Sequence, residues 1–124
     1  MLTDFTVYAT VPAADLARAR RFYEDKLGLK PGDVGSAGVM YQVQNSRMYL
    51  YSSTFAGTNK ATAAGFNVPN LTAVVAELKA KGVSFEEYDM GGDYKTVDSI
   101  MKTPDGLAAW FKDTEGNIIG LFQG

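Results

Sequence analysis

One stretch of this 124-residue sequence decides the fold: Asp15-Leu-Ala-Arg-Ala-Arg-Arg-Phe-Tyr-Glu-Asp-Lys-Leu-Gly-Leu29. Apolar residues recur in it at helical spacing, and both of its ends carry helix signals. Asp15 suits the N-cap, because its carboxylate can accept hydrogen bonds from the first free helical amides. Gly28 suits the position just past the last turn, where a left-handed backbone is needed. The stretch therefore predicts a helix that begins after Asp15 and ends at Gly28.

Extended segments flank this helix on both sides. The alternation in Phe5-Thr-Val-Tyr-Ala-Thr-Val11 predicts a half-buried strand, in which Phe5 and Val7 face the helix layer and Tyr8 faces the other way. Turn residues separate three further extended segments after the helix, at residues 30–34, 39–43 and 47–53. The first half of the chain thus predicts one strand, one helix and then three strands.

The second half repeats this order of elements. A strand is expected from Ala63, Asn70 takes the N-cap role, and Gly82 ends the second helix. Strands are then expected at residues 83–89, 107–112 and 118–123, with a hairpin turn at residues 114–117. The long segment from Gly91 to Gly106 is expected to be a loop over the scaffold.

Two such units predict one α+β domain over residues 1–124, built from two βαβββ modules. The first module covers residues 1–56, the second covers residues 63–124, and residues 57–62 link them. Each helix covers one face of its sheet, so one face of each sheet is left bare. The economical arrangement is an incomplete barrel in which the two bare faces meet around a cleft.

Composition excludes several functions. The chain has no histidine and no cysteine, which excludes a nitrogen- or sulfur-ligated metal centre, a Ser–His pair and a thiolate nucleophile. The net charge of −2 does not favour nucleic acid as a partner, and the basic cluster Arg18, Arg20 and Arg21 fits the solvent face of a helix. No apolar run approaches the ~18 residues of a membrane span, and the N-terminus does not read as a signal peptide. A cytoplasmic protein is expected.

With this layout the chain resembles the vicinal oxygen chelate superfamily, which includes glyoxalase I, extradiol dioxygenases, fosfomycin-resistance enzymes and bleomycin-resistance proteins. The resemblance rests on Asp15–Leu29 and, in the second module, on Lys79-Ala-Lys-Gly-Val83 and Ala109-Trp-Phe-Lys-Asp-Thr-Glu-Gly-Asn-Ile118. It implies the two-module incomplete barrel, a metal ion held by cleft-facing residues, and a homodimer in which two chains build each cleft.

The metal ligands that the resemblance implies fall on unsuitable residues in this chain. The usual histidine of the first strand falls on Tyr8, and its counterpart in the second module falls on Ala63. The carboxylate of the last strand falls on Gly120, and its counterpart in the first module falls on Tyr49, with Tyr51 as the alternative register. A bound ion would lose its protein ligands. We therefore expect neither a metal ion nor another cofactor.

Strand alternation predicts which residues fill the vacated cleft. The first module contributes bulky aromatic side chains, whereas three positions of the second module carry little or no side chain. One large wall and one nearly bare wall suit a flat, largely apolar or aromatic ligand. The residues expected to bind this ligand are Tyr8, Tyr49, Tyr51, Ala63, Gly65, Asn67, Trp110, Gly120 and Phe122.

Three functions are compatible with such a cleft. The first is sequestration of a small molecule without transforming it, which the resemblance to bleomycin-resistance proteins implies. The second is a metal-independent isomerase or cyclase that uses Tyr8 or Glu86 for proton transfer. The third is a non-catalytic pseudo-enzyme whose aromatic side chains occlude the cleft. The opposing small residues favour the first function, and the scarcity of acidic residues favours a neutral ligand over a strongly cationic one.

Overall fold

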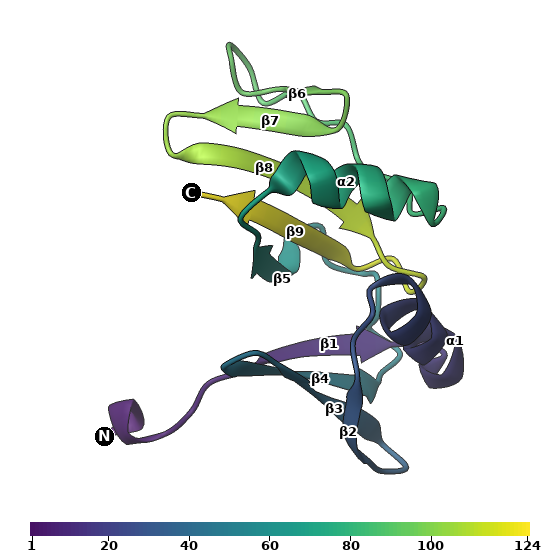
Figure 1. Cartoon of the computed structure of the whole chain (residues 1–124). Coiled ribbons are helices and arrows are strands. Elements are labelled where there is room, and N and C mark those ends of the chain that lie inside the picture. The colour runs from purple at the N-terminus through teal and green to yellow at the C-terminus, as the bar shows by residue number, and fades with distance from the viewer.

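In the computed structural model, which describes residues 1–124, the chain forms two sheets (Figure 1). The first sheet has the strand order β1-β4-β3-β2, and the second has the order β5-β9-β8-β7-β6. The strands of the first sheet are β1 (Ala9–Ala13), β2 (Pro31–Val34), β3 (Gly38–Val43) and β4 (Ser46–Ser52). Those of the second are β5 (Thr62–Asn67), β6 (Thr96–Val97), β7 (Ile100–Thr103), β8 (Gly106–Lys112) and β9 (Ile118–Gln123).

The helices are short. α1 (Leu16–Arg21) continues into a π-helical turn at Phe22–Lys26, and α2 (Leu71–Ala80) packs on the second sheet. A 3-10 helix at Leu2–Asp4 lies near the N-terminus. Neither the length nor the apolar character of any of these helices is sufficient to cross a membrane.

The predicted ends of both helices are confirmed. The side chain of Asp15 accepts a hydrogen bond from the Arg18 amide, and the side chain of Asn70 accepts one from the Ala73 amide. Gly28 follows the first helical segment with φ +74°, the left-handed region that favours glycine. Local capping chemistry therefore sets the helix boundaries.

The two sheets repeat one connectivity. In each sheet the strand before the helix pairs in parallel with the last strand, β1 with β4 and β5 with β9, and the other neighbouring strands are antiparallel. β1 and β5 contact each other, and the two sheets do not close. The predicted α+β fold of two βαβββ units in an incomplete barrel is confirmed.

A single apolar core joins both sheets to the helices. It includes Val11 and Leu50 from the first sheet and Phe111 and Ile119 from the second, all fully buried. The first helical segment also reaches the second sheet, because the ring of Phe22 lies 6.2 Å from that of Phe111. Each half of the chain thus completes its core with residues of the other half.

The strand expected from Phe5 begins only at Ala9. Phe5 and Val7 are 66% and 91% exposed, so the prediction that they face the helix layer is wrong. β1 pairs with β4 only from Ala9, opposite Met48, and the residues before it extend away from the fold (Figure 1). Alternation predicts which face of a strand a side chain takes, but a strand also needs a neighbouring strand to pair with. Residues before Ala9 have none, so their side chains stay exposed. We call residues 1–8 the N-terminal arm.

Residues 83–106 also differ from the prediction. The strand expected at 83–89 does not form, and the loop expected at 91–106 contains β6 and β7. Residues Gly106–Ala108 of β8 pair with β7. The segment at residues 83–89 therefore meets β8 only farther along, where Phe85 forms a bridge with Phe111 and the Glu86 amide donates to the Trp110 carbonyl. The acidic segment after Glu86 then turns back and pairs with the chain just before β6.

Candidate ligand-binding site

Three aromatic side chains lie together on the second sheet. Trp110 lies between Ala109 and Phe111, which are fully buried on the side of α2, so Trp110 points to the opposite, helix-free face. Its ring centre is 6.2 Å from that of Phe122 in an edge-to-face arrangement and 5.4 Å from that of Tyr88. These distances are typical of favourable aromatic contacts. We call Tyr88, Trp110 and Phe122 the aromatic platform.

A hollow of about 400 Å³ lies beside this platform. Trp110 and Phe122 line it together with Met90, Met101 and the amide-bearing Asn67, and the β7–β8 turn completes the wall. Its size falls within the range of small-molecule sites, and its lining combines apolar side chains with few polar groups. Thioethers also adapt their shape and contact aromatic rings favourably. The hollow can therefore hold a flat, mainly apolar molecule.

Phe122 covers the two glycines that were expected to form a bare wall. A Cβ atom added at Gly120 would lie 2.6 Å from Phe122 Cζ, and one added at Gly65 would lie 2.8 Å from Phe122 Cε2. The ring thus rests directly on the backbone of β5 and β9. The expectation of a nearly bare wall is wrong, because the missing side-chain volume is filled by an aromatic ring from a neighbouring position on the same face.

The aromatic residues of the first module form a separate group. The rings of Tyr49 and Tyr51 are stacked, with their centres 5.9 Å apart and their planes 3° from parallel. The guanidinium of Arg47 lies 5.3 Å from the ring centre of Tyr8, and it also donates a hydrogen bond to Thr6 Oγ1. Sequence reasoning missed Arg47, although Arg47 shares a strand face with Tyr49 and Tyr51.

The structure does not bring these two groups into one cavity. All the residues that line the hollow beside Trp110 belong to residues 67–124. Tyr8, Tyr49 and Tyr51 therefore do not line it. Ala63 is exposed and lies at an irregularity in the pairing of β5 with β9. Of the expected ligand-binding residues, Asn67, Trp110 and Phe122 line the hollow directly.

Glu86 lies beside the aromatic platform but not in the hollow. Its carboxylate is 3.4 Å from Lys112 Nζ, and 27% of its side chain is exposed. Partial burial and then the negative charge of Glu86 raise the pKa of the Tyr88 hydroxyl. Neither Tyr8 nor Glu86 is placed against the hollow where a bound molecule would lie.

The positions where the superfamily resemblance implies metal ligands do not fit a metal ion. Ala63 and Gly120 have no donor atom in their side chains, and Phe122 occupies the space against Gly120. The remaining positions carry the phenols of Tyr8 and Tyr49. Elsewhere in the chain, no three acidic side chains lie close enough together to hold a metal ion.

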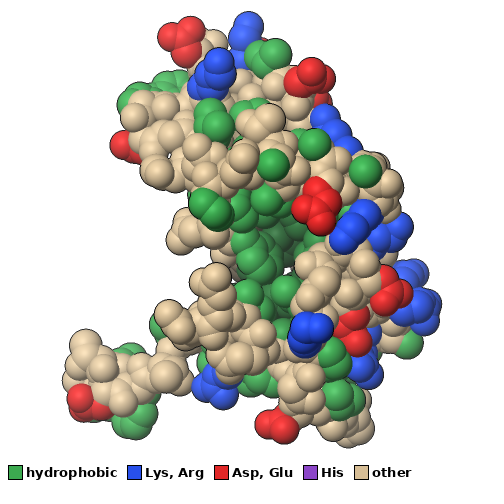
Figure 2. All heavy atoms as spheres, in the orientation of Figure 1, with side chains coloured by type: hydrophobic (Ala, Val, Ile, Leu, Met, Phe, Trp, Pro, Cys, Tyr) green, Lys and Arg blue, Asp and Glu red, His purple; other side chains and the backbone are tan.

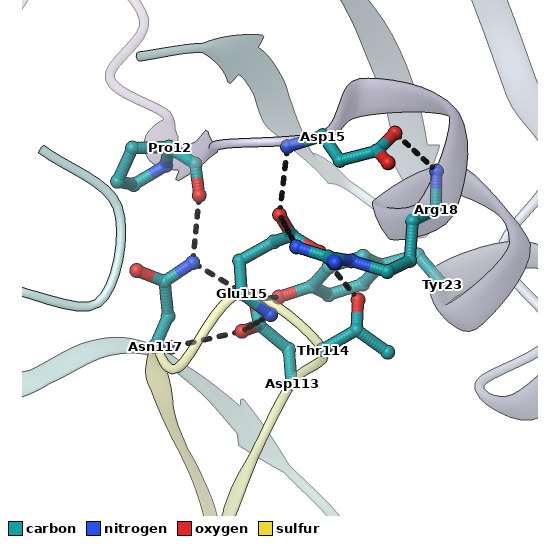
Figure 3. A network of polar contacts seen from close by, with 8 residues as sticks. All are labelled: Pro12, Asp15, Arg18, Tyr23, Asp113, Thr114, Glu115 and Asn117. Carbon is teal, nitrogen blue, oxygen red and sulfur yellow. Dashed lines mark hydrogen bonds and ion pairs between the residues drawn. The ribbon is translucent and has the colours of Figure 1, made fainter. Parts of the chain in front are cut away.

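A buried polar network joins the first helical segment to the β8–β9 turn (Figure 3). Arg18 Nε and Nη2 donate to the two carboxylate oxygens of Glu115 at 2.9 and 3.0 Å. The backbone amide of Asp15 donates to the same carboxylate at 2.9 Å. The side chain of Glu115 is fully buried, whereas that of Arg18 is 47% exposed. Arg18 thus lies on the solvent side of its helix, as expected, and its guanidinium is also paired with a buried carboxylate of the second module.

The same network continues through the turn. The Tyr23 hydroxyl donates to Asp113 Oδ2 at 2.5 Å, and Asn117 Nδ2 donates both to that atom and to the Pro12 carbonyl. Asn117 Oδ1 accepts a hydrogen bond from the Gly57 amide in the connection between the modules. These bonds tie the connection, β1 and the first helical segment to one turn of the second module.

The ionisation of these groups depends on their burial and partners. Burial alone would raise the pKa of Glu115, but hydrogen bonds from Arg18, the Asp15 amide and Thr114 outweigh this effect and lower the pKa to about 2. Burial and then the charge of Asp113 raise the pKa of Tyr23 well above its ordinary value. None of these residues lines the hollow, so the network positions the two sheets and does not contact a ligand there.

Comparisons with known proteins identify the family of the chain. The model of the Glyoxalase/Bleomycin resistance protein/Dioxygenase superfamily matches residues 6–121. No curated protein sequence matches the chain.

Solved structures share the fold over nearly the whole chain. Lactoylglutathione lyase from Agrobacterium tumefaciens has a TM-score of 0.72 at 14% identity, covering 97% of this chain and 93% of that chain. FosX, a fosfomycin resistance protein from Listeria monocytogenes, has a TM-score of 0.70 at 14% identity, with the same two coverages. TnmS3, an antibiotic binding protein from Streptomyces sp. CB03234, has a TM-score of 0.64 at 22% identity and covers 96% of each chain. Identities this low show the fold alone.

Proposed function

This chain belongs to the Glyoxalase/Bleomycin resistance protein/Dioxygenase superfamily, and we propose that it binds and sequesters a small, flat, largely apolar or aromatic molecule without a metal ion. One observation carries this proposal: the hollow of about 400 Å³ beside Trp110 and Phe122. A planar ligand there stacks on the aromatic platform, and the Asn67 amide supplies a hydrogen bond that orients it.

The lining of the hollow favours a neutral ligand. Asp105, on the exposed β7–β8 turn, is the one charged residue among the residues that line it. A strongly cationic or anionic molecule would lose water there without gaining a buried counter-charge. The proposed ligand class is therefore neutral aromatic molecules. TnmS3, a structural neighbour, is described as an antibiotic binding protein.

The other two functions have less support. Proton transfer by Tyr8 or Glu86 requires a substrate beside these groups, and neither residue lines the hollow. Occlusion by aromatic side chains applies to the space against Gly120, which Phe122 covers, but the hollow next to it is open. A homodimer and a cytoplasmic location stay predictions.

A fluorescence titration with N-phenyl-1-naphthylamine, a neutral naphthalene derivative, tests the proposal. We expect probe emission to rise on binding and the affinity to fall by at least about tenfold, or 1.4 kcal/mol, in both Trp110→Ala and Phe122→Ala. Tyr94→Ala is the control, because Tyr94 is half-exposed and does not line the hollow. Equal affinity in all four proteins would overturn the proposed site.

A second measurement tests the absence of a metal ion. We expect probe affinity to be unchanged after dialysis against EDTA, and elemental analysis to find no stoichiometric transition metal in the purified protein. A stoichiometric metal whose removal abolishes probe binding would contradict the metal-free part of the proposal while leaving the ligand site itself in place.

A further inference from the structure

Helix α2 covers only part of the second sheet. It packs on β8 and β9, and it leaves the same face of β6 and β7 open to solvent (Figure 1). Met101 and Ala108 line the hollow beside Trp110, so alternation places their neighbours along β7 and β8 on the opposite face, which α2 covers farther along. An uncovered strip of the sheet therefore lies beside α2, on the side away from the aromatic platform.

Apolar side chains form the floor of this strip. Val97 of β6 lies opposite Ile100 of β7, and Leu107 of β8 lies opposite Lys102 of β7. The side chain of Val97 is 67% exposed, whereas Ile100 and Leu107 are half-buried against the core. The strip thus presents an apolar surface that α2 does not cover.

Two lysines flank this floor. Because Thr96 pairs with Met101, Lys95 lies opposite Lys102, on the same face as Val97. Like charges directly opposite each other on one face of a sheet repel and are destabilising. The four ion pairs of the chain involve other residues, so neither ammonium group is paired with a carboxylate.

A pocket of about 550 Å³ lies over the strip. Its lining consists of the three apolar residues of the floor, the two lysines, Thr72 of α2 and Asp93. The volume falls within the range of small-molecule sites. Figure 2 shows Lys or Arg side chains beside hydrophobic ones at the upper end of the molecule, over β6 and β7. We call this space the lysine pocket.

We propose that the lysine pocket binds a small carboxylate that carries an apolar chain. The carboxylate lies between the ammonium groups of Lys95 and Lys102, and the chain covers the apolar floor. The anion relieves the repulsion between the two lysines, and the chain removes exposed hydrocarbon from water. The hydroxyl of Thr72, in the first turn of α2, is a further donor at the wall of the pocket.

The shape of the lysine pocket favours a small molecule over a lipid surface. Helix α2 forms one wall, and Ile100 and Leu107 are half-buried at the base, which a flat surface does not reach. The pocket shares only Leu107 with the hollow beside Trp110 and lies on the opposite face of the sheet. It is therefore separate from the site proposed for a neutral aromatic ligand.

Calorimetric titration with sodium octanoate tests the proposal. We expect saturable binding of one octanoate per chain, and an affinity that falls at least about fivefold in Lys95→Gln and in Lys102→Gln. Lys60→Gln is the matched control, because it loses the same charge from an exposed residue outside the pocket. The two pocket variants also lose a like-charge contact, so their circular dichroism spectra should be unchanged.

Two further comparisons separate the charge from the apolar chain. Octanol lacks the carboxylate and acetate lacks the chain, so we expect each to bind at least about tenfold more weakly than octanoate. Asp93→Asn removes a negative charge from the lining, and the affinity for octanoate should rise. Octanol that binds as tightly as octanoate would overturn the role of the lysines.

Other results would also overturn the proposal. These are no binding of octanoate, or equal affinity in Lys60→Gln and the two pocket variants. Displacement of N-phenyl-1-naphthylamine by octanoate would place octanoate in the hollow beside Trp110 instead. Sedimentation of the protein with phosphatidylglycerol vesicles, without binding of free octanoate, would assign the strip to a membrane surface. If octanoate does not bind while N-phenyl-1-naphthylamine does, this proposal fails and the proposed function does not.

Discussion

At the scale of single residues, Gly120 and Phe122 act as a pair. A Cβ atom at residue 120 would lie 2.6 Å from Phe122 Cζ, closer than carbon atoms pack, so the ring must shift to admit one. We expect Gly120→Ala to displace this ring and to lower the free energy of unfolding by about 1–3 kcal/mol, as overpacking does. Trp110, the only tryptophan, lies edge-on to Phe122, and its emission should change as well.

Thermal unfolding followed by Trp110 fluorescence measures this effect. Gly35→Ala is the matched control, because a Cβ atom there would lie 3.8 Å from the nearest atom and its φ is not positive. A Gly120→Ala protein as stable as Gly35→Ala, with unchanged emission, would show that Phe122 moves freely off the backbone.

The carboxylate of Glu115 makes the free energy of unfolding depend on pH in the acid range. Its pKa is about 2 in the folded protein and 4.5 without these contacts, so the folded state favours the charged form. Its contribution is fully present above about pH 4.5 and is lost as the pH falls towards 2. A shift of this size corresponds to about 3 kcal/mol.

The Glu115→Gln variant tests this contribution. We expect the wild type to exceed the variant in unfolding free energy most strongly above pH 4.5, and the difference to close towards pH 2 in denaturant titrations. Glu77→Gln, whose side chain is 68% exposed, should show no such closing difference. A constant difference across this pH range would rule out ionisation of Glu115 as its source.

At the scale of elements, the first helical segment is held to the second module by the hydroxyl of Tyr23. Removing it in Tyr23→Phe leaves Asp113 Oδ2 with the single side-chain donor Asn117 in a buried place. We expect a loss of about 1–2 kcal/mol in unfolding free energy, measured by urea denaturation. In the control Tyr94→Phe, the lost hydroxyl makes no hydrogen bond in the structure and lies in a half-exposed side chain, so stability should be unchanged.

The elements predicted correctly are those with local signals. Asp15 and Asn70 cap helices because the capped amides lie three residues away, and β8 and β9 follow from alternation beside a turn that contains Gly116 at φ +85°. The segment at residues 83–106 was not predictable in this way. Its structure depends on which residues of β8 remain free to form backbone hydrogen bonds with it once β7 has paired with β8.

At the scale of the whole molecule, the two modules share one core and should unfold together. We expect fragments 1–56 and 63–124 to be unfolded when produced separately, because each loses the other half of the cluster around Val11 and Phe111. The intact chain should unfold in one transition. Trp110 fluorescence, which reports on the second module, and far-ultraviolet circular dichroism should then give coincident midpoints. Two separated midpoints, or a folded fragment, would show that the modules are independent.

The sequence by itself determined the two repeated units, the helix ends and the faces of most strands, because these depend on residues a few positions apart. It also determined that histidine and cysteine take no part in any site. Only the tertiary structure decided that Phe122 covers Gly65 and Gly120, that Arg18 reaches Glu115 across 97 positions, and that Phe5 and Val7 have no partner in their own chain. Periodicity assigns a side chain to a face, but the neighbour that meets it there comes from a distant part of the chain, which local pattern does not specify.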